Sequence, residues 1–183
     1  MIRGGALLAA ACMLVGGCVV QGGARLGRAF STAAVDHDHV AWAGTVGGAL
    51  ALGPAYAGLE LEGRAEQRGG SQFTTGLQLG LATGTETSRF QLILHGDLGI
   101  PIAWSSRDGF YTGATLQMPV MLEEPLPITD RNRSLRILGG SILLTPFVRY
   151  RYYDLDVEGP ERERFHDLGA GMAIGIRYGT DLL

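Results

Sequence analysis

Apolar and polar residues alternate with a period of two through most of this 183-residue chain. In the segment 55–67, Leu59 and Leu61 fall on one face of an extended strand, while Glu60 and Glu62 fall on the other. The pattern recurs in the segments 72–81, 90–102, 110–120 and 167–178, with turn-forming residues between them. The sequence therefore predicts an all-β, antiparallel up-and-down meander of seven or eight strands, with 25–35 as a candidate extra strand.

A sheet with one apolar face must bury that face, either around an apolar core or, turned inside out, within a lipid bilayer. Three features favour the bilayer. The apolar faces run for about 10 to 12 residues, close to the roughly 9 to 11 with which a tilted strand crosses a membrane. The opposite faces combine glycines with charges of both signs, which suits a narrow polar lumen. Aromatic residues also lie mostly towards strand ends, as in an interfacial girdle: Trp42, Trp104, Tyr111, Tyr150, Tyr152, Tyr153 and Tyr178.

On this pattern, the segment 40–178 resembles the small outer-membrane barrels of Gram-negative bacteria, which have about eight strands and a filled interior. The resemblance implies a meander closed into a small barrel, with apolar side chains facing lipid. Proline cannot donate to a sheet ladder, so Pro101, Pro119 and Pro146 are expected near strand ends or at bulges. Pro146 is the hardest of the three to place.

Charged residues on the inward faces form the candidate site, a polar network in the lumen. Its predicted members are Glu60, Glu62, Arg64, His95, Asp97 and Arg177. One interpretation is a proton-active or ion-conducting interior, and the other is a buried network whose charges satisfy one another. We favour the second, because the interior of an eight-stranded barrel is just wide enough for side chains to fill it.

The N-terminus has the order of a bacterial secretory signal: Arg3, an apolar run over 6–15, and small residues before Cys18. The ending resembles a lipoprotein lipobox, which implies a signal peptide over 1–17, a palmitate-bearing lipid on Cys18, an acylated linker over 18–38 and a barrel over 39–183. The alternative is an ordinary cleaved signal peptide with a chance cysteine. Under both interpretations the protein leaves the cytoplasm.

Nothing in the sequence indicates catalysis. No nucleophile, base and carboxylate converge, and no glycine-rich phosphate loop precedes a helix, so neither an enzyme nor a nucleotide cofactor is indicated. The run from Asp36 to His39 offers two imidazoles, which alone make a weak metal site, so no metal or other cofactor is expected. The net charge is only −3 and acids are mixed among the arginines, which excludes a nucleic-acid partner.

The leading hypothesis is an outer-membrane β-barrel, lipid-modified, with a structural, adhesive or envelope-interaction role. Its partners would be the lipid bilayer and other cell-envelope components. The alternative is a lipid-anchored periplasmic barrel of opposite polarity, resembling a lipocalin, that binds an apolar ligand. Its pocket would be lined by Leu59, Leu61, Phe73, Leu77, Leu92 and Leu116.

Overall fold

The structure is a computed structural model of the chain. It describes residues 17–30, 39–52, 54–66, 71–83, 90–102, 108–122, 140–156 and 162–179. All of the predicted signal peptide except Gly17 lies outside these residues, as do His37 and Trp104. No helix in the described residues is long and apolar enough to cross a membrane.

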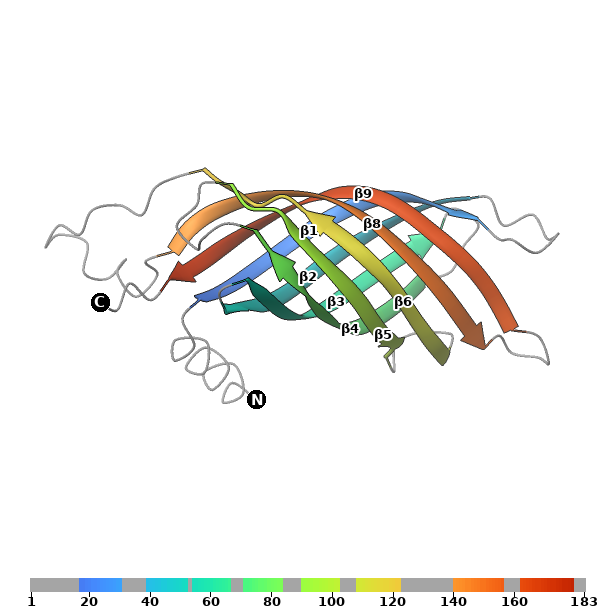
Figure 1. Cartoon of the computed structure of the whole chain (residues 1–183). Helices are drawn as coiled ribbons and strands as arrows, with labels where there is room; N and C mark the ends of the chain where they lie inside the picture. The colour runs from blue at the N-terminus through green and yellow to red at the C-terminus, as the bar shows by residue number, and fades with distance from the viewer. Residues whose placement is uncertain are drawn as a thin grey trace, which may run out of the picture.

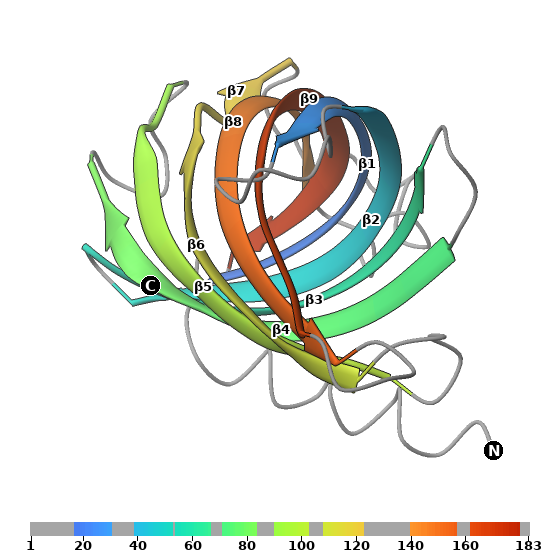
Figure 2. The same cartoon turned by 90° about the vertical axis from the view of Figure 1, so that its right-hand side faces the viewer.

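The described residues form one antiparallel sheet that closes on itself (Figures 1 and 2). Its strands are β1 (Gly17–Phe30), β2 (His39–Leu52), β3 (Ala55–Glu66), β4 (Ser71–Ala82), β5 (Ile93–Pro101), β6 (Asp108–Gln117), β7 (Val120–Met121), β8 (Gly140–Asp156) and β9 (Arg162–Gly179). Each strand pairs with the next along the chain up to β6. Pairing of β6 with β8 and of β1 with β9 then closes the ring. The two-residue β7 continues β6 in the same register against β8, so the described residues build an eight-stranded barrel.

The barrel has two ends, which we name by its strands. β1 starts and β9 finishes at the near end, and β1 finishes and β9 starts at the far end. The registers define how far the strands tilt. A path across the ladder from Val20 passes through Gly48, Leu59, Leu77, Leu98, Thr112, Tyr152 and His166, and it returns to β1 at Phe30. The stagger is therefore ten residues, 30 minus 20, which for eight strands corresponds to a tilt of about 40°.

Two prolines, Pro119 and Pro146, interrupt the ladder at one place on neighbouring strands, and a third, Pro101, lies at the other end of β5. Pro101 is the last residue of β5, and Pro119 lies between β6 and β7. Pro146 lies inside β8, where its carbonyl accepts a hydrogen bond from the Met118 amide at 3.0 Å. Each strand residue directs its N–H and C=O to the same neighbour, so Pro146 loses one bond towards β6 and Pro119 loses one towards Gln91. The lost bonds are confined to this point, and the register is the same on both sides of it.

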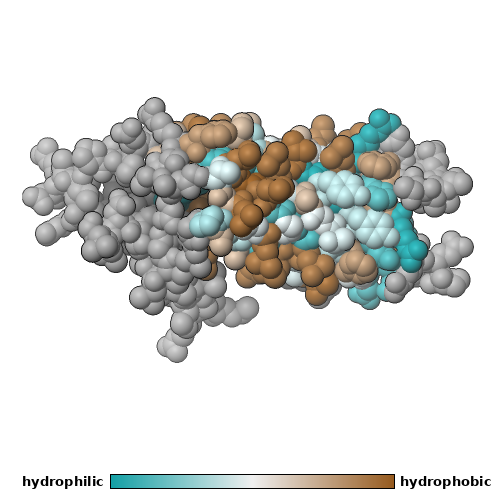
Figure 3. Space-filling view, viewed as in Figure 1, coloured by the Kyte–Doolittle hydropathy of each residue, from teal (hydrophilic) through white to brown (hydrophobic). Residues whose placement is uncertain are grey.

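Apolar side chains cover the outer wall of the barrel. Every large apolar residue on the apolar face of β4 and β5 is exposed, including Leu77, Leu81 and Leu98. Figure 3 shows the resulting apolar band across the middle of the visible face. The lipocalin-like alternative is wrong on this point. The side chains expected to line its pocket all point outward: Leu59, Leu61, Phe73, Leu77, Leu92 and Leu116.

Residues 18–30, expected in a linker, instead belong to β1. This strand pairs with β2 and with β9 over nearly its whole length, so the barrel is closed by it. Its alternation is faint in the sequence because small residues such as Gly22 and Ala24 occupy outward positions between Val20 and Leu26. β8 is a single strand that runs without a turn from Gly140 to Asp156.

Candidate functional site: a charged network inside the barrel

The centre of the lumen is crossed by ion pairs between β3 and β8, which lie on opposite sides of the ring. Residues two apart on a strand face the same way, so β3 presents Glu60 and Glu62 inward and β8 presents Arg149 and Arg151. Arg149 donates to Glu60 from Nη1 and Nη2 at 2.8 and 2.6 Å, and Arg151 Nη2 donates to Glu60 at 2.6 Å. These bonds join opposite walls of the barrel directly.

Glu62 is contacted by three guanidinium groups. Arg25 of β1 donates to it from Nε at 3.2 Å and from Nη2 at 2.8 Å, and Arg149 Nη1 donates at 2.9 Å. Arg151 Nη1 lies 3.1 Å from the same carboxylate. Arg25 also pairs with Asp167 of β9 at 2.9 Å, which extends the network towards the far end.

A second group, around Asp97 of β5, adjoins these pairs. His95 Nδ1 lies 2.8 Å from Asp97 Oδ1, and the Thr115 hydroxyl donates to Oδ2 at 2.6 Å. Arg149 Nε donates to the same hydroxyl at 3.0 Å, so Thr115 links Asp97 to the central arginine. On its other side, the His95 ring is 2.9 Å from the Gln117 amide nitrogen.

The buried charges among the described residues balance. At the centre of the lumen, the buried cations are Arg25, Arg64, Arg149 and Arg151, and the buried anions are Glu60, Glu62, Asp97 and Asp167. Two further buried charges lie outside this layer: Arg177 at the near end and Asp154 on the outward row of β8. Removing a charge from water costs several kcal/mol unless partners compensate it. Four arginines opposite four carboxylates supply that compensation, so the charged layer is formally neutral when His95 is neutral.

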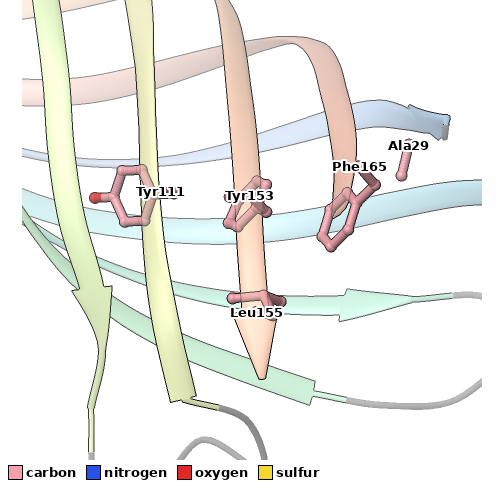
Figure 4. Packing of buried hydrophobic residues seen from close by; sticks show 5 residues of the cluster. All are labelled: Ala29, Tyr111, Tyr153, Leu155 and Phe165. Atoms are coloured by element: carbon pink, nitrogen blue, oxygen red, sulfur yellow. The ribbon is translucent and has the colours of Figure 1, made fainter. Parts of the chain in front are cut away.

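Apolar and aromatic side chains fill the lumen on both sides of the charges, towards the far end and towards the near end. At the far end, Ala29, Tyr111, Tyr153, Leu155 and Phe165 pack together, all of them buried (Figure 4). Tyr153 and Phe165 stack with centroids 4.7 Å apart, and the Arg64 guanidinium lies 4.8 Å from the Phe165 centroid.

At the near end, a second cluster contains Tyr56, Ile93, Ala49 and Ala82. The charged layer therefore lies between two apolar layers, and this arrangement excludes water from it.

Inward glycines make room for these large side chains. Gly76 and Gly99 are partners across β4 and β5, and Tyr111 is the next residue in the same row. A methyl group on either glycine would collide with the Tyr111 ring or hydroxyl. Gly27 and Gly169 are a second such pair, beside Arg25 and Asp167. The glycines of the inward face thus serve close packing of the lumen.

Five of the six predicted network residues lie in or beside the charged layer: Glu60, Glu62, Arg64, His95 and Asp97. Arg177 lies apart, at the near end, where it donates to Gln91. The sequence reasoning missed the following members: Arg25, Arg149, Arg151 and Asp167. Alternation with Val148, Tyr150 and Tyr152 is the signal that would have placed Arg149 and Arg151 inward.

The girdle prediction was correct for some aromatic residues and wrong for others. Trp42, Tyr150 and Tyr152 lie on the outer wall, but Tyr111 and Tyr153 are 1% and 0% exposed inside the lumen. Trp104 and the side chain of Tyr178 lie outside what is described. The registers place an outward aromatic residue at one level near the far end on four of the eight strands, β2, β4, β6 and β8: Trp42, Phe73, Phe110 and Tyr152.

Among the described residues, no group of three or more His, Cys, Asp or Glu side chains could hold a metal ion. The His95–Asp97 pair resembles part of a catalytic relay, but the other neighbour of His95 is the Gln117 amide, which is no nucleophile. What the arrangement does chemically is link β1, β3, β5, β6, β8 and β9 to one another through the lumen.

The fold and the interior together define a class: small antiparallel barrels whose apolar wall faces outward around a filled polar core. A solved structure resembles this chain in its fold over most of its length. The crystal structure of Neisserial surface protein A (NspA) matches 89% of this chain and 99% of its own, with a TM-score of 0.65 and 10% identity.

Two further structures match more loosely. Outer membrane protein AlkL, solved by solid-state NMR in DMPC lipid bilayers, has a TM-score of 0.44 at 11% identity and covers 92% of each chain. A de novo designed transmembrane β-barrel has a TM-score of 0.43 at 10% identity, over 87% of this chain and 95% of its own. No known protein-family model and no curated protein matches this sequence.

Proposed function

We propose that this protein is an outer-membrane β-barrel of a Gram-negative bacterium with a structural or envelope-interaction role and no catalysis. The single observation that carries the proposal is the polarity of the barrel. Among the described residues, the outer wall carries 28 exposed large apolar residues, while the arginines and carboxylates of the charged layer pair inside. Such a wall has no place in water, and a closed barrel leaves no unpaired strand edge in hydrocarbon.

The interior supports a sealed barrel in preference to a channel. Ions crossing the lumen would have to displace Arg149 and Arg151 from Glu60 and Glu62, and then pass an aromatic layer at the far end. The barrel therefore anchors the chain in the membrane, and its interactions with other molecules are made by its connectors and its outer surface. Cell-envelope components at the two membrane surfaces are the partners that this geometry permits.

Lipid modification of Cys18, after removal of a signal peptide over 1–17, is part of the proposal. Cys18 is the second residue of β1, and its Cα is paired with Leu50 and Tyr178 at the near end. An acylated residue at this position would start the barrel at the edge of the bilayer, where its chains can enter the adjacent leaflet. Cleavage before Cys18 would also leave β1 almost complete.

Fractionation of cells that produce the full chain tests whether the strands themselves hold the protein in the membrane. We expect the wild type and Cys18→Ala to resist carbonate and urea extraction, and both to migrate differently on a gel before and after boiling. Release of Cys18→Ala into the soluble fraction would contradict the membrane-spanning barrel.

Labelling with radioactive palmitate separately tests the lipid. We expect it to be lost in Cys18→Ala and kept in Cys12→Ala, the matched control in the same N-terminal segment. Equal labelling of the two variants would contradict acylation at Cys18.

A further inference from the structure

The outer wall carries an aromatic cluster at the far end that neither the lumen nor the apolar band explains. It extends over three neighbouring strands, from Phe30 of β1 across His166 of β9 to Tyr150 and Tyr152 of β8. His166 lies at its centre, with ring centroids 5.4 Å from Phe30, 5.8 Å from Tyr150 and 5.3 Å from Tyr152. We call these four residues the outer cluster.

The hydrogen bond inside the outer cluster fixes the polar edge of the imidazole. The Tyr150 hydroxyl lies 2.6 Å from His166 Nδ1. When the hydroxyl donates to Nδ1, the neutral ring carries its proton on Nε2. In the protonated ring Nδ1 donates to the hydroxyl instead, and Nε2 again carries a proton. His166 then presents an N–H donor on the side away from Tyr150, on a surface that is otherwise made of ring faces.

Two arginines flank the outer cluster. Arg28 is exposed on β1 between Leu26 and Phe30, and the Arg164 side chain is 59% exposed on β9. Arg164 Nε lies 3.3 Å from Asp154, the acidic residue of the same outward row. Asp156 and Asp108 follow it, also exposed, but further towards the rim.

The position of these residues along the barrel limits which ligands can contact them. Arg28 and His166 lie near the level of Trp42, Phe73, Phe110 and Tyr152, which mark the boundary of the apolar band. At that boundary the bilayer presents lipid headgroups, and the anion present there is the lipid phosphate. Long arginine side chains reach towards this layer while their stems remain on the apolar wall.

We propose that the outer cluster, with Arg28 and Arg164, is a binding site for the phosphate of an anionic membrane lipid. His166 Nε2 and the two guanidinium groups supply donors to the phosphate oxygens, and the rings of Tyr150 and Tyr152 contact the acyl chains next to the headgroup. The inference rests on the proposed function, because it requires a barrel that spans a bilayer.

Native mass spectrometry of the folded barrel in detergent, titrated with phosphatidylglycerol, tests the site. Phosphatidylcholine with the same acyl chains is the zwitterionic comparison. The variant is the double change Arg164→Gln with His166→Phe, which keeps a ring at the centre of the outer cluster. Its matched control is Arg68→Gln, which removes one arginine charge from the connector after β3.

We expect the first phosphatidylglycerol to bind the wild type and Arg68→Gln alike, and the double variant about tenfold more weakly, since hydrogen bonds to charged groups have been lost at an exposed site. Phosphatidylcholine should bind all three weakly. Equal phosphatidylglycerol affinity for the wild type and the double variant would overturn the site, and so would an equal loss in Arg68→Gln.

Heat-dependent gel migration of every variant separates this result from the proposed function. If the wild type itself shows no folded band, the membrane barrel fails and the lipid site fails with it.

Discussion

Glu62 is the carboxylate on which the charged layer most depends, and its removal should destabilise the whole barrel. Glu62→Gln keeps the shape of the side chain but leaves Arg25, Arg149 and Arg151 facing a neutral amide, with four cations opposite three anions in the charged layer. Removing one partner of a buried ion pair typically costs about 3 to 5 kcal/mol. We expect a loss of about 4 kcal/mol in the free energy of unfolding, relative to the wild type in the same lipid vesicles.

A double-mutant cycle with Arg25→Gln gives the sharper test. Arg25 pairs with Glu62 at 2.8 Å and also with Asp167, so this change alone should cost a similar amount. The double variant restores the balance of the charged layer at three and three, so its cost should fall short of the sum of the single costs by about 2 to 3 kcal/mol. Urea titration followed by the folded band on unboiled gels measures all four proteins. Additive costs would refute the idea that charge balance stabilises the lumen.

Three further results are expected. Leu77→Arg should cost about 2 to 4 kcal/mol in vesicles, because it puts a charge on the outer wall near mid-membrane, while Leu81→Arg near the end of the same strand should cost about 0 to 1 kcal/mol; equal costs in urea titrations would contradict the assigned depth. Gly76→Ala should lose about 1 to 3 kcal/mol by overpacking against the Tyr111 ring, and Tyr111→Leu in the same chain should recover part of it; no recovery would show that the ring is not the obstacle. The wild-type barrel in a planar bilayer should conduct no steady current, and regular unitary steps would contradict a filled lumen.

The fold could be predicted from the sequence wherever large apolar side chains on one face of a strand alternate with small or polar residues on the other. Leu77, Leu79 and Leu81 alternate with Gln78 and Gly80, and the corresponding strand forms as expected. β1 could not be recognised in this way, because several outward positions hold glycine or alanine and carry almost no hydropathy signal. Its pairing with β2 and β9 depends on distant residues, which a local pattern does not contain.

For the candidate site, the sequence predicted on which face of a strand a charged residue lies, but not the residue with which it pairs. Alternation alone places Glu60 and Asp97 inward, yet it cannot indicate that Arg149 of β8 lies within hydrogen-bonding distance of Glu60. That contact depends on the number of strands and the stagger that bring β3 and β8 to opposite sides of the ring. Tyr111 and Tyr153 were misplaced for a related reason. An aromatic residue near a strand end suits an interface or a lumen equally well, and only the parity of the strand distinguishes the two.

The ion pairs between β3 and β8 also constrain how the barrel can enter a membrane. Glu60 and Arg149 are separated by 89 residues, so a hairpin of β3 and β4 would carry two carboxylates into hydrocarbon long before their partners are available. Such a hairpin alone would be strongly unfavourable in lipid. The charges therefore require β8 to approach β3 before either crosses the bilayer, which makes insertion and closure a single cooperative step and gives assembly a strongly non-local character.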